Sequence, residues 1–293
     1  MIRIFITGGS GFIGKNLVEA LADRYEIHAP ASAELDLREE NAVRRYLERN
    51  RFDVVVHTAT TRSNRRLGAP CDMLDRNCRM FFNLARNEHA FGKMIYFGSA
   101  AEYNRVELPP RVSEDYFDTC VPTDAYGFSK YVCAKYAEGR PTLVNLRLFG
   151  IFGKYEAWDV RFISNACARV ISGLPIVLRQ NVVFDYLCVQ DLATITGWFI
   201  ENTPQQTSYN VCTGRGWELR NLAEIVAAVS GQKPEIVVKT PGMGAEYTGD
   251  NSRMMKEIPA LQFEPMHAAI KALYGWYEEN RKAIDPAMLR HDG

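Results

Sequence analysis

The sequence has no charge excess and no long apolar run. Its 293 residues carry 35 Lys and Arg against 35 Asp and Glu, so the formal net charge is zero. A balanced charge gives no support for nucleic acid or an acidic membrane surface as a partner. No apolar stretch approaches the roughly 20 residues that cross a bilayer. The opening MIRIFITGG has no basic segment followed by a long apolar one, so we expect no signal peptide and no membrane partner.

The seven cysteines contain no Cys-x-x-Cys pair. A zinc site needs ligands at short spacing, and a disulfide framework is typical of smaller secreted chains. We therefore predict no metal site, and reduced cysteines in a cytoplasmic protein.

Short apolar runs alternate with amphipathic segments in the first half of the chain. The runs predict buried strands at 2–7, 53–58, 94–99 and 142–148. The segments between them predict helices at 14–24, 39–50, 73–91 and 125–138. Strands that alternate with helices indicate an α/β fold, a Rossmann-like doubly wound parallel sheet with helices on both faces.

The alternation fades after about residue 150. Helices are predicted at 161–173, 191–202, 218–230 and 266–282, with a strand at 182–187. We expect residues 1–150 to form a nucleotide-binding domain, with some later segments returning to it. Residues 151–293 then form mainly a smaller, mixed substrate-binding lobe, with substrate in the crevice between the two. The residues from Asp285 lack a pattern and are expected to be frayed.

A glycine-rich loop follows the first strand. It reads Gly8-Gly9-Ser10-Gly11-Phe12-Ile13-Gly14. Gly8 permits a tight turn, Gly11 lets the backbone approach a pyrophosphate, and Gly14 lets the next helix pack closely on the strand. That helix offers free N–H groups and a positive dipole to phosphate. A glycine turn without a ligand is the alternative, but the strand before it and the helix after it favour a dinucleotide. We predict cofactor contacts from Gly8, Ser10, Gly11, Phe12, Ile13 and Gly14.

The choice between NAD and NADP depends on the second strand, near 26–29. Many NAD-binding folds end this strand with an acid for the ribose 2′-hydroxyl, whereas here Pro30-Ala31-Ser32 follows. Ser32 would tolerate a 2′-phosphate, although no arginine sits beside it. NADP is weakly favoured and NAD stays open. Asp36 lies too far beyond the end of the second strand to bind the ribose. We expect it either to contact the adenine edge or to cap a helix or turn.

Tyr126 and Lys130 form a Tyr-x-x-x-Lys pair at the start of a predicted helix. Residues four apart share one helical face, so the ammonium can lie near the phenol. A phenol with a pKa of about 10 is a poor base at neutral pH, and a nearby cation lowers that value. Tyr126 can then exchange a proton with a substrate oxygen. Ser99 ends a predicted strand at the edge of the sheet where ligands bind, and its hydroxyl can hold the same oxygen. An exposed helix is the alternative for the pair taken alone.

Together these motifs resemble the extended short-chain dehydrogenase/reductase family of nucleotide-sugar epimerases, dehydratases and ketoreductases. Further segments of the chain match the family's pattern: Val56-His57-Thr58-Ala59, Leu146-Arg147-Leu148-Phe149 and Phe184-Asp185-Tyr186. The resemblance implies a Rossmann-like fold, bound NAD(P), catalysis by Ser99, Tyr126 and Lys130, and a homodimer formed through two helices per subunit. It also implies cofactor contacts from Asp36, Leu37, Thr58, Ala59, Tyr126 and Lys130.

Departures from the family's pattern narrow the chemistry. Dehydratases of the family have Thr-Asp-Glu after the serine strand, where this chain has Ala100-Ala101-Glu102. Relatives that make fucose nucleotides use a Cys and a His, where this chain has Ala101 and Arg161. What remains is reduction of a keto-sugar or reversible 4-epimerisation. We favour the reductase, because a missing ribose acid fits a dissociable NADPH. An epimerase with tightly bound NAD needs the same three residues and stays open.

Substrate contacts are less well marked. The family commonly holds the sugar diphosphate with an Asn and two Arg, whereas the matching residues here are Gly150, Phe184 and Thr240. Ser99 and Ala100 are predicted to contact the sugar, and Arg161 and Arg179 are candidates for the phosphates. Arg62, Arg65 and Arg66 are further candidates. For each arginine a solvated surface role is the competing interpretation.

Two other functions stay open. A cofactor-sensing protein without turnover would be expected to lose the Tyr or the Lys, and both are present. A reductase of a small carbonyl compound is compatible with the missing diphosphate contacts. His57, on a buried strand, is predicted to be a core histidine rather than a base.

Overall fold

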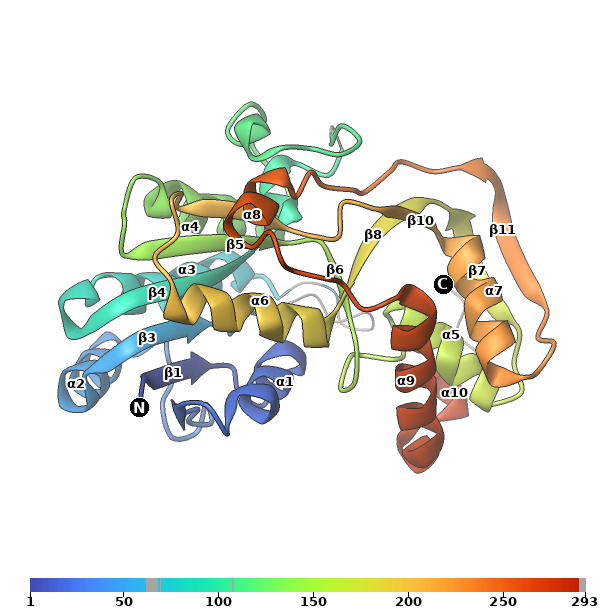
Figure 1. Ribbon diagram of the computed structural model, residues 1–293, viewed down its shortest axis with the longest axis horizontal. Helices are drawn as coiled ribbons and strands as arrows, with labels where there is room; N and C mark the ends of the chain where they lie inside the picture. Colours follow the sequence, from blue (N-terminus) through green and yellow to red (C-terminus); the bar gives the residue numbers. More distant parts are fainter. Residues whose placement is uncertain (62–67, 69, 107, 290–293) are drawn as a thin grey trace.

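A six-stranded parallel sheet forms the centre of the protein, in the strand order β2-β1-β3-β4-β5-β9 (Figure 1). The computed structural model describes residues 1–61, 68, 70–106 and 108–289. The strands are β1 (Arg3–Thr7), β2 (Glu26–His28), β3 (Phe52–His57), β4 (Phe91–Ser99), β5 (Leu143–Leu148) and β9 (Ser208–Val211). The predicted Rossmann-like α/β fold is confirmed.

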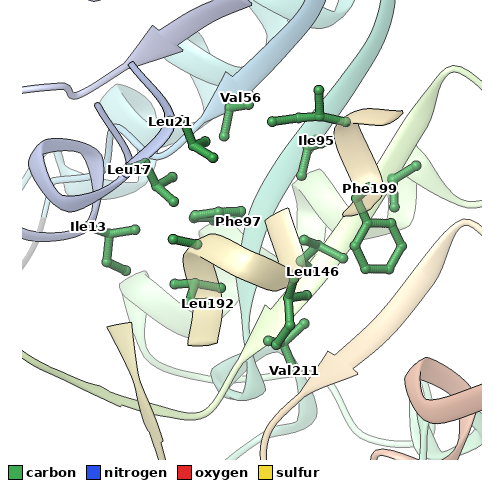
Figure 2. Packing of buried hydrophobic residues seen from close by; sticks show 14 of the residues in the cluster. Ile13, Leu17, Leu21, Val56, Ile95, Phe97, Leu146, Leu192, Phe199 and Val211 are labelled. Carbon is green, nitrogen blue, oxygen red and sulfur yellow. The ribbon is translucent and has the colours of Figure 1, made fainter. Parts of the chain in front are cut away.

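Helices cover both faces of this sheet because alternate strand residues point to opposite sides. On one face α1 (Phe12–Leu21) packs against α6 (Val189–Glu201), and apolar residues of both helices meet strand residues such as Val56 and Phe97 (Figure 2). The other face is covered by α2 (Glu40–Asn50), α3 (Met73–Ala85) and α4 (Ala125–Ala137). Their apolar residues bury the neighbouring strand positions, Val55 among them.

The strand order reverses at β1, which has β2 on one side and β3 on the other. In open α/β sheets the crevice at such a switch point, outside the carboxyl ends of the strands, is where ligands bind. The glycine loop after β1 and Ser99 at the end of β4 both lie at this edge.

Two smaller sheets and five helices make up most of the remaining chain. One sheet has the order β10 (Gly216–Glu218), β8 (Val183–Cys188), β6 (Gly150–Phe152), and the other pairs β11 (Ile236–Met243) with β7 (Ile176–Asn181). The helices are α5 (Phe162–Ile171), α7 (Leu219–Ser230), α8 (Ser252–Glu257), α9 (Met266–Glu279) and α10 (Pro286–Leu289). Helices α5, α7 and α9 share one buried apolar cluster. Short 3-10 helices cover Glu88–Ala90, Ala100–Tyr103, Glu114–Tyr116 and Arg281–Ala283.

Two local predictions are wrong. The helix predicted at 73–91 ends at Ala85, because Phe91 already pairs with Phe52 in the sheet. The residues after Asp285 are not frayed as far as Leu289, which is 1% exposed and accepts a hydrogen bond from Arg169 at 2.6 Å. None of the helices in the described ranges is long and apolar enough to cross a membrane. The division at residue 150 stays a prediction, with β9 and α6 returning to the large sheet.

Candidate active site

The glycine loop is shaped to receive phosphate. Gly8 has a φ of 68°, and the Gly11 amide donates to the Gly8 carbonyl at 2.9 Å, which closes the turn. A Cβ on Gly14 would lie 2.2 Å from the Gly8 oxygen, so no side chain fits there. Gly11 caps α1 without any side-chain hydrogen bond. The first N–H groups of α1 therefore remain available to phosphate oxygens.

Two cavities open on either side of this loop. The first, of about 390 Å³, is lined by Gly8, Ser10, Ser32, Asp36, Leu37 and Ala59. The second, of about 450 Å³, is lined by Phe12, Ile13, Thr58, Ser99, Tyr126 and Lys130. A dinucleotide with its pyrophosphate on the loop would place adenosine in the first cavity and nicotinamide in the second. The residues present fit the cofactor, and all those predicted to contact it lie in the loop or line one of these cavities.

The first cavity, called the adenosine cavity below after the group expected in it, is lined by cations that do not neighbour Ser32 in the sequence. The sequence shows no arginine beside Ser32, yet the fold brings Arg38 and Arg76 to the same cavity. Arg38 pairs with Asp36 at 2.6 Å and lowers the pKa of that carboxyl. The Asp36 carboxylate also accepts from the Arg38 amide at 2.9 Å. Asp36 thus lines the cavity and also stabilises its own turn, and its contact with adenine stays a prediction.

The three predicted catalytic residues line one cavity. Tyr126 lies in the first turn of α4, where the Asp124 side chain caps the helix by accepting from the Gly127 amide at 2.9 Å. Lys130, one turn later and 5% exposed, donates to the Phe97 carbonyl at 2.7 Å. Its ammonium lies 6.0 Å from the centre of the Tyr126 ring. Ser99 ends β4 on the same side of the cavity. The arrangement suits proton exchange with a substrate oxygen.

A buried ion pair holds Ser99 in place. Glu102 accepts from the Ser99 amide at 2.9 Å and from Arg147 Nε at 2.6 Å, and the side chains of Glu102 and Arg147 are at most 1% exposed. Asn145 donates to the same carboxylate at 2.9 Å. The Ser99 oxygen accepts from the Ala101 amide at 3.2 Å, so its hydroxyl proton is left to donate elsewhere. No sequence motif indicates the Glu102–Arg147 ion pair, because the two residues are 45 positions apart in the chain.

The cavity is uncharged at the two positions where the resemblance implies a polar diphosphate clamp. Gly150 has no room for an Asn side chain, because a Cβ there would lie 2.7 Å from the Asp185 carbonyl oxygen. The Phe184 ring is tilted against Tyr247 at a centroid distance of 5.0 Å and stacks on Tyr186 at 5.6 Å. Both chain positions line the cavity and neither can bind phosphate through a side-chain charge.

The candidate phosphate-binding arginines separate in the fold. Arg161, at the N-cap of α5, lines the cavity. Arg179 is exposed on β7, and Thr240 on β11 pairs with the next residue, Gln180; neither Arg179 nor Thr240 is among the described residues that line the cavity. Ala100 is fully buried behind Ser99. Arg62, Arg65 and Arg66 lie outside the described residues. The substrate roles of Ser99, Ala100, Arg161 and Arg179 all stay predictions.

Arg105 and Tyr247 are among the cavity residues that sequence reasoning missed. No sequence motif includes either residue. Arg105 follows a short 3-10 helix, and Tyr247 lies in the second half of the chain, far from Ser99 in the sequence. His57 is the core residue that was predicted. It is 2% exposed, its Nδ1 lies 2.8 Å from the Thr7 hydroxyl, and burial lowers its pKa to about 3.

Comparison with known proteins gives matches over most of the chain. The model of the family described as "NAD dependent epimerase/dehydratase family" matches residues 4–212. GDP-L-colitose synthase of Yersinia pseudotuberculosis is 22% identical over 80% of this chain and 84% of that protein. GDP-6-deoxy-D-talose 4-dehydrogenase of Aggregatibacter actinomycetemcomitans is 27% identical over 80% of this chain and 82% of that protein.

Solved structures share the fold. A GDP-L-fucose synthetase from Naegleria fowleri bound to NADP superposes with a TM-score of 0.82 at 17% identity, over 96% of this chain and 94% of that one. At this identity the likeness concerns the fold alone.

Proposed function

The chain belongs to the NAD dependent epimerase/dehydratase family, and on that premise we propose that it reduces a keto group of a nucleotide-activated sugar, with Tyr126 as the proton donor. It is an NAD(P)-dependent enzyme of the extended short-chain dehydrogenase/reductase type. The observation that carries the proposal is that Ser99, Tyr126 and Lys130 line one cavity beside the glycine loop.

Each of the three residues has one role. The Ser99 hydroxyl donates to the keto oxygen and orients it. Tyr126 gives its phenolic proton to that oxygen as the alcohol forms, and the Lys130 ammonium stabilises the phenolate that remains. When bound, the reduced dinucleotide would supply the hydride for the carbonyl carbon. The buried Glu102–Arg147 pair keeps Ser99 at the end of β4 throughout.

Water elimination is disfavoured by the side chains next to Ser99. Ala100 and Ala101 carry no acid or base, and Glu102 is fully buried in its ion pair with Arg147. Glu102 therefore cannot reach the sugar to take a proton. Simple hydride and proton transfer at one carbon remains.

The names of two relatives support a nucleotide-sugar substrate, and one of them supports chemistry at carbon 4. The Aggregatibacter protein is named a GDP-6-deoxy-D-talose 4-dehydrogenase and the Yersinia protein a GDP-L-colitose synthase. We propose the same substrate class for this chain, bound between the large sheet and the residues after 150. We also propose a homodimer, as in the family it resembles, which light scattering tests.

The test begins with the cofactor. The purified protein is denatured and any released dinucleotide is identified, and then NADPH oxidation is followed with 4-keto nucleotide sugars. An empty site that takes up NADPH and oxidises it with a keto-sugar supports the reductase. Stoichiometric, retained NAD together with interconversion of 4-epimers would replace it by the epimerase, whose cycle keeps the hydride on the enzyme.

A further inference from the structure

Arg105 is an arginine of the substrate cavity to which no role has yet been given. It follows the short helix Ala100–Tyr103 and Asn104, whose left-handed φ of 58° turns the chain. Arg105 lines the cavity that contains Ser99 and Tyr126. It therefore comes from the catalytic side of the cavity, whereas Arg161 comes from α5 in the second half of the chain.

Tyr247 contacts Arg105 and lines the same cavity as the predicted catalytic residues. The Arg105 guanidinium carbon lies 5.5 Å from the centre of the Tyr247 ring. Burial raises the pKa of Tyr247, and the Arg105 charge and hydrogen bonding with Ser99 and Arg105 work in the opposite direction. Tyr247 thus contacts Arg105 through its ring and lines the same cavity as Ser99. Arg105 and Tyr126 therefore face one cavity.

Arg105 is exposed where it lines the cavity, and the carboxylates of Asp124 and Glu156 belong to the same lining. Among the described residues no carboxylate forms an ion pair with Arg105 or with Arg161. The two arginines of the adenosine cavity differ, because Arg38 pairs with Asp36 and Arg76 with Asp72. The wall beside Arg105 is aromatic, formed by Phe149, Phe184 and Tyr247. An unpaired guanidinium in a cavity with such walls attracts an oxyanion, which it can bind through two parallel N–H donors.

We propose that Arg105 binds an anionic oxygen group of the substrate in the cavity that Ser99 and Tyr126 line. Two sources share this chemistry, the diphosphate of a nucleotide sugar and the carboxylate of an acidic sugar. The proposal deepens the proposed function, since it concerns how the substrate cavity is used. It also explains how the chain holds its substrate although Gly150 and Phe184 carry no charge.

The test measures anion binding apart from turnover. Inorganic pyrophosphate and D-glucuronate are titrated into the NADPH-bound protein by calorimetry, for wild type, Arg105→Gln, Arg105→Lys and Arg45→Gln. Arg45 is exposed on α2, outside the cavities, and serves as the matched control. We expect Arg105→Gln to weaken binding of one probe about tenfold or more, as for loss of a charged hydrogen bond. Arg105→Lys should lie in between, and Arg45→Gln should match wild type.

The outcomes are distinct. Loss of pyrophosphate binding in Arg105→Gln identifies the diphosphate as the source, and loss of glucuronate binding identifies a sugar carboxylate. If both probes bind Arg105→Gln as they bind wild type, or neither binds wild type, the proposal is overturned. NADPH affinity must be equal in all four proteins, which also shows that the variants are folded. Anion binding at Arg105 without oxidation of NADPH by any keto-sugar would leave this proposal standing and remove the proposed function.

Discussion

Replacing Arg147 by Met should destabilise the protein strongly, because the buried Glu102 carboxylate then has no cation to pair with. The Arg147–Glu102 contact is 2.6 Å, and neither side chain is more than 1% exposed. Burial lowers the pKa of the guanidinium, but the charges and hydrogen bonds of Glu102 and Tyr103 together raise it above its ordinary value. Methionine fills much of the same volume but leaves Glu102 without its cation. The Glu102 carboxylate would keep only its hydrogen bonds from the Ser99 amide and the Asn145 side chain.

The size of the stability loss in Arg147→Met follows from the burial of the ion pair. Removing one partner of a buried pair costs about 3–5 kcal/mol, because the remaining charge is uncompensated. Arg147 also stacks 4.3 Å from the centre of the Phe117 ring, and losing that contact adds roughly 1 kcal/mol. Against a total stability of about 5–15 kcal/mol, the loss is large. In the double variant Glu102→Gln/Arg147→Met no charge is stranded, so we expect it to recover about half of the loss.

The assay is equilibrium unfolding in urea of wild type, both single variants and the double variant. Arg79→Met, which breaks an exposed ion pair with Asp75 on α3, is the matched surface control and should unfold like wild type. The reasoning is refuted if Arg147→Met lies within about 1 kcal/mol of wild type, a loss typical of surface changes. Strictly additive single-variant losses would refute the coupling between the two residues.

Three further predictions concern the cofactor, the catalytic lysine and pH. Gly14→Ala should weaken NADPH binding in a fluorescence titration, since its Cβ would lie 2.2 Å from the Gly8 oxygen; unchanged affinity would contradict the loop geometry. Lys130→Met should impair both turnover and NADPH affinity, and unaltered affinity would count against a contact with the nicotinamide ribose. His57 has a folded pKa of about 3, below its unfolded value, so its contribution to stability is complete above pH 6.5 and is lost as pH falls toward 3. At pH 5 that loss is about 2 kcal/mol, and His57→Gln should flatten the unfolding profile between pH 6.5 and 5; an unchanged slope would contradict the assignment.

The sequence was most informative where local pattern determines structure. The apolar runs ending at Thr7 and Ser99 predicted β1 and β4, because buried parallel strands are short and apolar on both faces. The glycine loop likewise specified its own geometry. The position of Ser99, Tyr126 and Lys130 around one cavity followed from the strand–helix order, since carboxyl ends of parallel strands meet at one edge.

Features made by long-range contacts could not be predicted in this way. Glu102 and Arg147 are brought together by the pairing of β4 and β5, and Tyr247 reaches the cavity from a segment near the end of the chain. Arg38 and Arg76 join Ser32 in one cavity although they lie on different elements. The strands β7 and β11 pair across 60 residues, with little alternation in either.

The most direct test of the central claim is NADPH oxidation at 340 nm with 4-keto nucleotide sugars, for wild type and Tyr126→Phe. Wild type should oxidise NADPH and place its hydride on the former carbonyl carbon, which deuterated NADPH and mass spectrometry follow. Tyr126→Phe should bind NADPH as wild type does and show no oxidation, because it lacks the proton donor. Wild-type turnover in Tyr126→Phe would contradict the role of Tyr126, and no oxidation by wild type with any keto-sugar would contradict the proposed reductase.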